Sequence, residues 1–121
     1  MPKWLIKAGL ASMVAGLGLA LASCSSPDPG DGTSLTVIDV RTAEEYAEGH
    51  LKGALNIDVQ LPDFPAQISA LDKEGSYLVY CWAGNRSWAA YEYMTEVGFT
   101  DVTDGGDMQN AAKTTGLAIV Q

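Results

Sequence analysis

The sequence predicts an α/β fold, in which a parallel sheet of about four to five strands carries helices on both faces. Three observations indicate this class. The β-branched run "LTVIDV" at 35–40 and the apolar run "YLVY" at 77–80 are typical of strands covered on both sides. Each is followed by a segment whose apolar residues have helical spacing. Strands that alternate with helices in this way run parallel, because the helix returns the chain to the starting edge.

The first half of the domain contains two predicted helices and a short strand. Thr42 and Glu45 have the spacing of a capping box, and Gly49 ends the short helix that they begin. "ALNI" at 54–57 predicts a strand. Apolar residues at i, i+4 and i+7 in the segment 62–75 predict the second helix.

The second half predicts one long helix and a weaker end. Apolar residues recur with helical spacing through "SWAAYEYMTEVG" at 87–98, and Gly98 ends the helix. "FTDVT" at 99–103 predicts a last short strand. The segment 105–116 predicts a turn and a weak helix.

The N-terminal residues 1–23 have the features of an export signal. Lys3 and Lys7 provide the charged start, and the uncharged run Ala8–Ala22 is shorter than the roughly 20 residues of a membrane span. The end of the run, "LASC", resembles the lipobox of bacterial lipoproteins, in which the cysteine, here Cys24, is lipidated. An ordinary cleavage near position 22 or 23, with Cys24 an incidental free thiol, and an uncleaved anchor helix are the alternatives.

All three alternatives place the domain outside the cytoplasm, on the periplasmic or outer face of a bacterial membrane if Cys24 is lipidated. Residues 24–34 predict a flexible tether, and 35–121 the domain. Removal of 1–23 leaves 5 basic and 15 acidic residues. Nucleic acid is therefore an unexpected partner, and contact with a membrane is expected only through the lipid anchor.

One loop carries the chemistry that the sequence predicts. Cys81 follows the apolar strand, and "CWAGNRS" leads into a helix, where parallel sheets place their reactive groups. Gly84 is free to adopt positive φ, and Ser87 is expected to cap the helix. Inward-curling amides and the helix N-terminus would stabilise a thiolate, and Arg86 adds positive charge. The alternative is that Cys81 is a small buried filler at the end of an apolar strand.

Two stretches resemble the signatures of the rhodanese family. "VIDVRTAEEYAEGHLKGALNI" at 37–57 is similar to its "DVR…EEY…GH…GA.NI" stretch, and "VYCWAGNRS" at 79–87 to its "C-x-x-G-x-R-S" loop. The closing "GFTDVTDGG" at 98–106 resembles the "GY..V..L.GG" segment. The resemblance spans about 35–120 and is greatest to the small periplasmic rhodaneses of the phage-shock type.

The resemblance implies a thiosulfate sulfurtransferase, which moves a sulfane sulfur to cyanide or a thiol through a Cys81 persulfide. Asp39 and Arg41 would brace the active loop, and His50 would be a packing residue rather than a base. Amides of the loop would hold the persulfide, and Arg86 and Ser87 would help to bind the donor. The expected substrate-binding residues are Trp82, Ala83, Gly84, Asn85, Arg86 and Ser87.

The sequence departs from the family pattern in two ways. The strand and helix that usually precede "DVR" are absent, which would bare a sheet edge and allow a monomer or a weak homodimer. Trp82 stands where many members carry a polar or basic residue, so the best donor or acceptor is expected to be less anionic than thiosulfate.

Two other functions compete with sulfur transfer. Cysteine phosphatases also place a cysteine and an arginine around an anion-binding loop, but theirs has one residue more than "WAGN". The domain could instead be a non-enzymatic sulfur carrier or a partner-binding module. The acidic stretches "EEYAE" and "TDVTDGGD" have no histidine or cysteine cluster, so we expect no metal and no cofactor.

Overall fold

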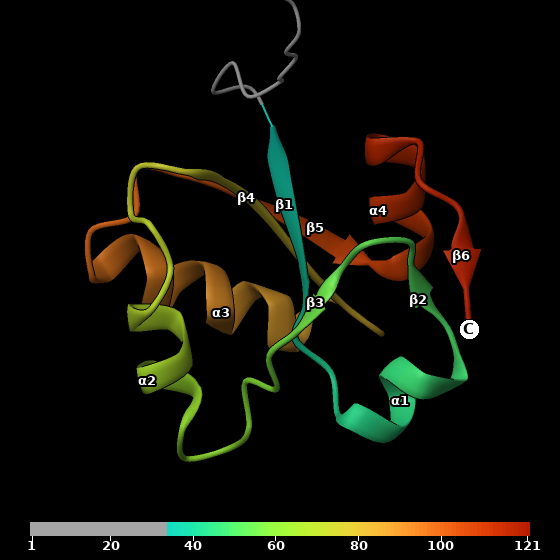
Figure 1. Ribbon diagram of the computed structural model, residues 1–121, viewed down its shortest axis with the longest axis horizontal. Coiled ribbons are helices and arrows are strands. Elements are labelled where there is room, and N and C mark those ends of the chain that lie inside the picture. The colour runs from blue at the N-terminus through green and yellow to red at the C-terminus, as the bar shows by residue number, and fades with distance from the viewer. Residues whose placement is uncertain (1–33) are drawn as a thin grey trace, which may run out of the picture. The chain divides into compact units, whose positions relative to one another are not determined.

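The computed structural model describes residues 34–121, which form one compact unit (Figure 1). The predicted signal 1–23, the lipidation site Cys24 and the tether up to residue 33 lie outside the described residues. Within 34–121, none of the helices has the length and apolar character that crossing a bilayer requires.

A four-stranded parallel sheet forms the centre of the unit and confirms the predicted fold class. Its strand order is β3-β1-β4-β5, so β1 and β4 are central and, among residues 34–121, β5 has a strand neighbour on one side only. The strands are β1 Leu35–Asp39, β3 Leu55–Asn56, β4 Ser76–Cys81 and β5 Asp101–Asp107.

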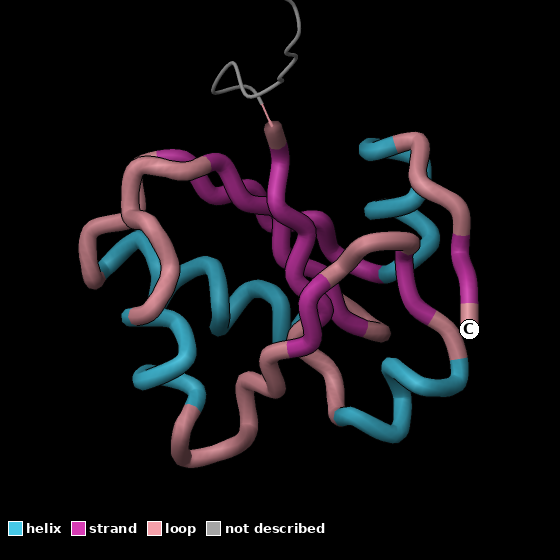
Figure 2. The backbone as a smooth tube through the Cα atoms, viewed as in Figure 1, coloured by secondary structure: helices cyan, strands magenta, loops and turns pink. Residues whose placement is uncertain are grey.

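The helices cover both faces of this sheet. In Figure 1, α2 and α3 lie together on one side and α1 and α4 on the other. Figure 2 shows the strands gathered between these helices. The helices are α1 Ala43–Glu48, α2 Phe64–Ser69, α3 Asn85–Glu96 and α4 Met108–Thr115.

Strand β4 divides the core into two clusters. Tyr77, Val79 and Cys81 pack in the cluster that contains residues of α2 and α3, whereas Leu78 and Tyr80 pack in the cluster that contains residues of α4. Because successive side chains of a strand point to opposite faces, this alternation alone directs Cys81 to the α3 side.

Strand β5 is longer than the predicted strand at 99–103. It continues through two glycines to Asp107, with an irregular register opposite the end of β4. A Cβ at Gly105 would lie 2.5 Å from Leu78 Cδ2 and 3.0 Å from Val79 O. Gly105, which the sequence pattern assigned to a turn, therefore allows β5 to pass close to β4. Asp107 ends β5 and caps α4, since its side chain accepts the N–H of Asn110.

A small antiparallel pair was not predicted. β2 (His50–Leu51) pairs with β6 (Ile119–Val120), which brings residues 119–120 beside the short strand that follows α1. Two-residue strands have no periodicity that a sequence pattern could reveal.

Candidate functional site

Cys81 is the last residue of β4 and lies at the carboxyl end of the parallel sheet. Its side chain is 1% exposed and faces α3. The thiol is free. A buried cysteine is either an inert core residue or a reactive thiolate, and the groups that surround its sulfur distinguish the two.

Backbone amides converge on the Cys81 sulfur. Sγ accepts the N–H of Gly84 at 2.9 Å and the N–H of Ser87 at 3.3 Å. Gly84 has φ 96°, the left-handed conformation that glycine adopts without a steric penalty, and this turns the loop back over the sulfur. The predicted positive φ at Gly84 and the curled loop are therefore confirmed.

Two opposing effects set the pKa of the Cys81 thiol. Burial by itself raises it, because a charged sulfur is poorly solvated in the core. The Ser87 side chain and the N–H groups of Ser87, Gly84 and Ala83 lower it, and together they outweigh the burial. The pKa of Cys81 therefore lies below its ordinary value, which favours the nucleophilic thiolate.

The prediction that Ser87 caps α3 is wrong. The helix begins two residues earlier, at Asn85, with Gly84 in the capping position. Ser87 is buried in the first turn, and its hydroxyl donates to Gly84 O at 3.1 Å. The physical reason is the left-handed turn at Gly84, which starts the helix directly and leaves Ser87 to hold the loop.

Arg86 pairs with Glu45. Its Nη1 and Nη2 donate to Glu45 Oε1 and Oε2 at 2.8 and 3.1 Å, a two-point contact between α3 and α1. The hydrogen bond from Arg86 is the main reason that the pKa of Glu45 falls to about 2. The Arg86 guanidinium, which we expected to bind the sulfur donor, is thus already paired with Glu45. Its contact with a sulfur donor stays a prediction.

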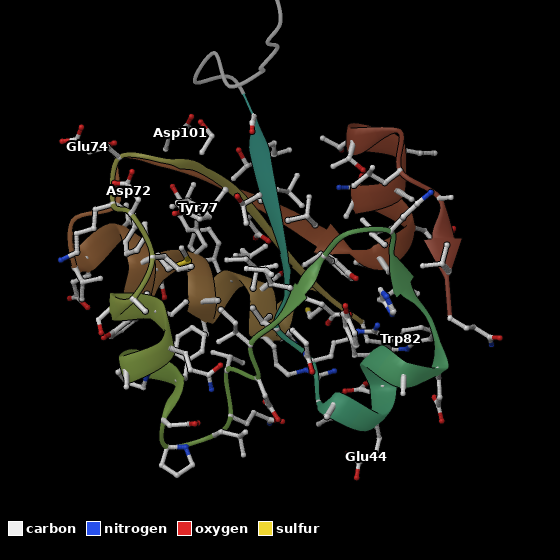
Figure 3. All side chains as sticks on the ribbon, in the orientation of Figure 1. Glu44, Asp72, Glu74, Tyr77, Trp82 and Asp101 are labelled. Atoms are coloured by element: carbon white, nitrogen blue, oxygen red, sulfur yellow. The ribbon has the colours of Figure 1, made fainter. Side chains whose placement is uncertain are left out.

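The other loop residues form the rim. Trp82, Ala83 and Asn85 are exposed, and 63% of Trp82 is accessible. In Figure 3, Trp82 lies next to α1, in the half of the unit that holds α1 and α4. Trp88 is also half exposed and stacks on Tyr91, with ring centroids 5.2 Å apart, on the surface of α3.

Asp39 and Arg41 form a buried pair behind the loop. Arg41 Nη2 donates to Asp39 Oδ2 at 2.7 Å and to Gly49 O at 2.6 Å. Tyr80 Oη donates to Asp39 Oδ2 at 2.9 Å, and it accepts the N–H of Leu51 at 3.0 Å. The side chains of Asp39 and Arg41 are almost completely inaccessible. These contacts join β1 to Tyr80 of β4 and to Gly49, and the bracing of the active loop that the family resemblance implies stays a prediction.

His50 has the contacts of a packing residue. Its ring stacks on Tyr46 with centroids 3.7 Å apart, and its Nδ1 lies 2.7 Å from Tyr46 O. Within residues 34–121, no group of three or more His, Cys, Asp and Glu side chains could hold a metal ion. The expectation of a reaction without metal or cofactor stays a prediction.

Two cavities adjoin Trp82. One, of about 280 Å³, lies between α1 and α4 and has both apolar and acidic walls. The other, of about 350 Å³, is lined by Trp82, Asp107, Met108 and Gln109. The walls of the first are Arg41, Glu45, Glu48, Gly49, Trp82, Met108 and Ile119.

Two residues of this region were missed by the sequence reasoning. Glu45 was identified only as part of a capping box, and Tyr80 only as part of a strand. Both keep those roles, since Glu45 Oε1 accepts the N–H of Thr42 at 3.0 Å. Their second roles depend on partners 41 positions away, for which the local sequence gives no signal.

Residues 28–106, more than half of the chain, match the family of rhodanese-like domains. The chain belongs to this family. Over 75 residues it is 36% identical to the thiosulfate sulfurtransferase PspE of Escherichia coli strain K12, and the match covers 62% of this chain and 72% of that protein.

Two further curated relatives have related names. The chain is 41% identical over 73 residues to the thiosulfate sulfurtransferase GlpE of Pseudomonas fluorescens strain SBW25, covering 58% of this chain and 64% of that protein. It is 39% identical over 74 residues to the putative sulfurtransferase YtwF of Bacillus subtilis strain 168, covering 61% and 70%. The match thus spans about two thirds of each relative.

Solved structures agree with the family assignment. A rhodanese with anions from E. coli superposes with a TM-score of 0.60 at 31% identity, covering 73% of this chain and 99% of that chain. A rhodanese-like domain from Anabaena sp. superposes with a TM-score of 0.63 at 25% identity, covering 73% and 100%. The rhodanese-like fold is therefore shown by sequence and by structure.

Proposed function

We propose that this chain is a sulfurtransferase that moves a sulfane sulfur from thiosulfate or a similar donor to cyanide or a thiol, through a Cys81 persulfide. The observation that carries the proposal is the pair of N–H groups, of Gly84 and Ser87, that donate to Cys81 Sγ at the start of α3. Such a cradle stabilises the thiolate before attack and the anionic persulfide after it.

The donor step needs no acid or base from the protein. The Cys81 thiolate attacks the outer sulfur of thiosulfate, the bond between the two donor sulfurs breaks, and sulfite leaves with its electron pair. The new outer sulfur is bonded to Sγ and carries the negative charge. In the second step, cyanide bonds to the outer sulfur and leaves as thiocyanate, and Sγ takes back the electron pair as a thiolate.

Mass spectrometry of the peptide that contains Cys81 tests the proposal. After exposure to thiosulfate we expect a gain of one sulfur, which cyanide removes and which Cys81→Ser abolishes. No gain with any sulfane donor would overturn sulfur transfer. Hydrolysis of an aryl phosphate without persulfide formation would instead support the cysteine phosphatase.

Kinetic measurements on the same protein distinguish an enzyme from a non-enzymatic carrier. An enzyme produces thiocyanate in the steady state from thiosulfate and cyanide. A carrier loads Cys81 in one turnover and then turns over slowly without its partner. We expect steady-state production, since the second step returns Cys81 to the thiolate that the amide cradle stabilises and that attacks the next donor.

We also propose that the chain is exported and anchored through lipidated Cys24, as the "LASC" sequence suggests. Labelling of cells with a fatty-acid analogue should mark the wild-type chain and leave Cys24→Ser unlabelled. Equal labelling of the two would exclude lipidation at this residue.

We propose that the chain is a monomer or a weak homodimer. Sedimentation of the detergent-solubilised chain would distinguish these states from a larger assembly.

A further inference from the structure

The cavity between α1 and α4 adjoins the Cys81 loop, since Trp82 of that loop and Glu45, the partner of Arg86, both line it, and it is poor in available positive charge. Arg86 is held by Glu45 at two points, and Arg41, the other basic residue beside the cavity, is paired with buried Asp39. Each guanidinium therefore faces a carboxylate, and the two pairs contribute little net attraction for an anion. A dianion such as thiosulfate meets no free cation among the residues that line this cavity.

The carboxylate of Glu48 gives the cavity a negative charge. It lies at the end of α1, is exposed, and lines the 280 Å³ cavity together with Trp82. Its backbone carbonyl accepts from Gln121, but among residues 34–121 no side chain pairs with its carboxylate. Asp107 adds a second acidic side chain in the 350 Å³ cavity that Trp82 also lines. The surface around the Trp82 indole, which we call the acidic rim and which Glu48, Trp82 and Asp107 form, is thus negatively charged.

Apolar surface completes the arrangement. Trp82 is 63% exposed and Ile119 is 42% exposed, and both line the same cavity as Glu48. An accessible indole face and a nearby unpaired carboxylate together attract an ammonium group, through the quadrupole of the ring and through Coulomb attraction. An anionic group gains neither contribution.

We propose that this rim selects an acceptor thiol that carries a positively charged ammonium group a few atoms from its sulfur, with Glu48 and Trp82 as the residues that set this preference. The inference rests on the proposed sulfur transfer and names the substrate class of its second step. The acceptor sulfur bonds to the outer sulfur of the Cys81 persulfide, and the bond to Sγ breaks. Sγ keeps the electron pair, and the thiol proton stays with the product persulfide.

Three small thiols of similar size test the preference: cysteamine, 2-mercaptoethanol and 3-mercaptopropionate, which are cationic, neutral and anionic. The full chain is loaded with sulfur from excess thiosulfate and freed of donor, and loss of the sulfur from the Cys81 peptide is timed with each thiol. Comparing each variant with the wild type cancels the intrinsic reactivity of the thiols.

Glu48→Lys reverses the charge at the rim. We expect the rate with cysteamine to fall about threefold and the rate with 3-mercaptopropionate to rise about threefold, as reversal of a screened, solvent-exposed charge would give. Trp82→Leu should lower the cysteamine rate about two- to fivefold more than it lowers the 2-mercaptoethanol rate, because only the ammonium group gains from the ring. At 1 M salt, where the Debye length is about 3 Å, the effect of Glu48→Lys should disappear.

Glu74→Lys is the matched control. Glu74 is exposed and precedes β4, whereas Cys81 ends that strand, and Figure 3 shows Glu74 and Trp82 at opposite ends of the unit. Six strand residues span about 20 Å, more than two Debye lengths at physiological salt. The same charge change at this position should leave the ratio of the cysteamine and 3-mercaptopropionate rates within about twofold.

The two failures are distinguishable. Normal sulfur loading combined with the same rate ratio in Glu48→Lys and wild type would overturn this inference alone. A Cys81 that takes up no sulfur from any donor would overturn the proposed function and this inference with it.

Discussion

The Tyr80 hydroxyl donates to Asp39 Oδ2 at 2.9 Å while it accepts the N–H of Leu51 at 3.0 Å. This one oxygen joins β1 and β4 to Leu51 of β2, in a part of the core from which water is excluded. Burial is the main reason that the pKa of Tyr80 rises far above its ordinary value, so the hydroxyl stays a donor at any accessible pH.

Tyr80→Phe should therefore destabilise the fold. It leaves the ring in place but deprives the buried Leu51 N–H of its acceptor, which costs about 1–3 kcal/mol of unfolding free energy. Urea denaturation measures the loss. Tyr93→Phe is the control, since the Tyr93 ring packs on Phe64 and its hydroxyl has no protein partner among residues 34–121. Equal stability of the two variants would contradict the role assigned to the Tyr80 hydroxyl.

The thiolate of Cys81 should form below the ordinary thiol pKa of 9.0. Burial raises this pKa, and the hydrogen bonds of Ser87, Gly84 and Ala83 lower it further than burial raises it. Ser87→Ala should move the titration midpoint up toward 9.0. The ultraviolet absorbance of the thiolate, with Cys81→Ser as the blank, follows the titration, and Ser76→Ala at the far end of β4 should not shift it.

The same shift has a consequence for stability. A thiol whose pKa is lower in the folded than in the unfolded state stabilises the fold above its unfolded pKa, and this contribution disappears as the pH falls through the folded pKa. Wild type should thus gain unfolding free energy relative to Cys81→Ser as the pH is raised toward 9.0. A constant difference between the two across this range would show that the sulfur is not held as a thiolate.

Glu45 should make the fold sensitive to acid. The hydrogen bond from Arg86 lowers its pKa from 4.5 to about 2, so its stabilising contribution is complete above 4.5 and disappears as the pH falls from 4.5 to about 2. Glu45→Gln keeps an acceptor for the Thr42 cap but removes the charge. Urea midpoints of the two proteins should differ at pH 6 and converge near pH 2. A gap that persists at pH 2 would assign the effect to the cap.

Gly105→Ala tests the close passage of β5. The new Cβ would lie 2.5 Å from Leu78 Cδ2, so we expect a loss of about 1–3 kcal/mol as the core is forced apart. Gly49→Ala is the control, because its Cβ would meet Ile119 Cγ2 at 3.7 Å and its φ of 165° is extended. Thermal unfolding that treats both substitutions alike would contradict the packing seen here.

Local patterns predicted the parts of this molecule that local interactions determine. The Thr42–Glu45 capping box forms as its spacing indicated, with Glu45 N donating to Thr42 Oγ1 at 3.1 Å. Gly84 adopts the positive φ that a tight strand-to-helix loop requires. The motif that led to the family thus also located the sulfur and the amides around it.

Features that depend on distant partners could not be predicted in the same way. The pairing of β2 with β6 joins segments about 70 positions apart, and Arg86 meets Glu45 only because α1 and α3 come together at the carboxyl edge of the sheet. Gly105 resembles a turn residue until the position of Leu78 is known. The sequence pattern shows where a chain bends, but not what it meets after bending.

The alternation along β4 fixes which helix the reactive sulfur meets. Inserting one residue into this strand upstream of the loop would rotate position 81 to the opposite side of the sheet, toward α4, without altering any residue of the loop itself. Inserting two would restore its orientation. Insertions of an odd number of residues in β4 should consequently abolish the chemistry, and insertions of an even number should preserve the orientation of Cys81. A search for intact motifs would not detect this difference.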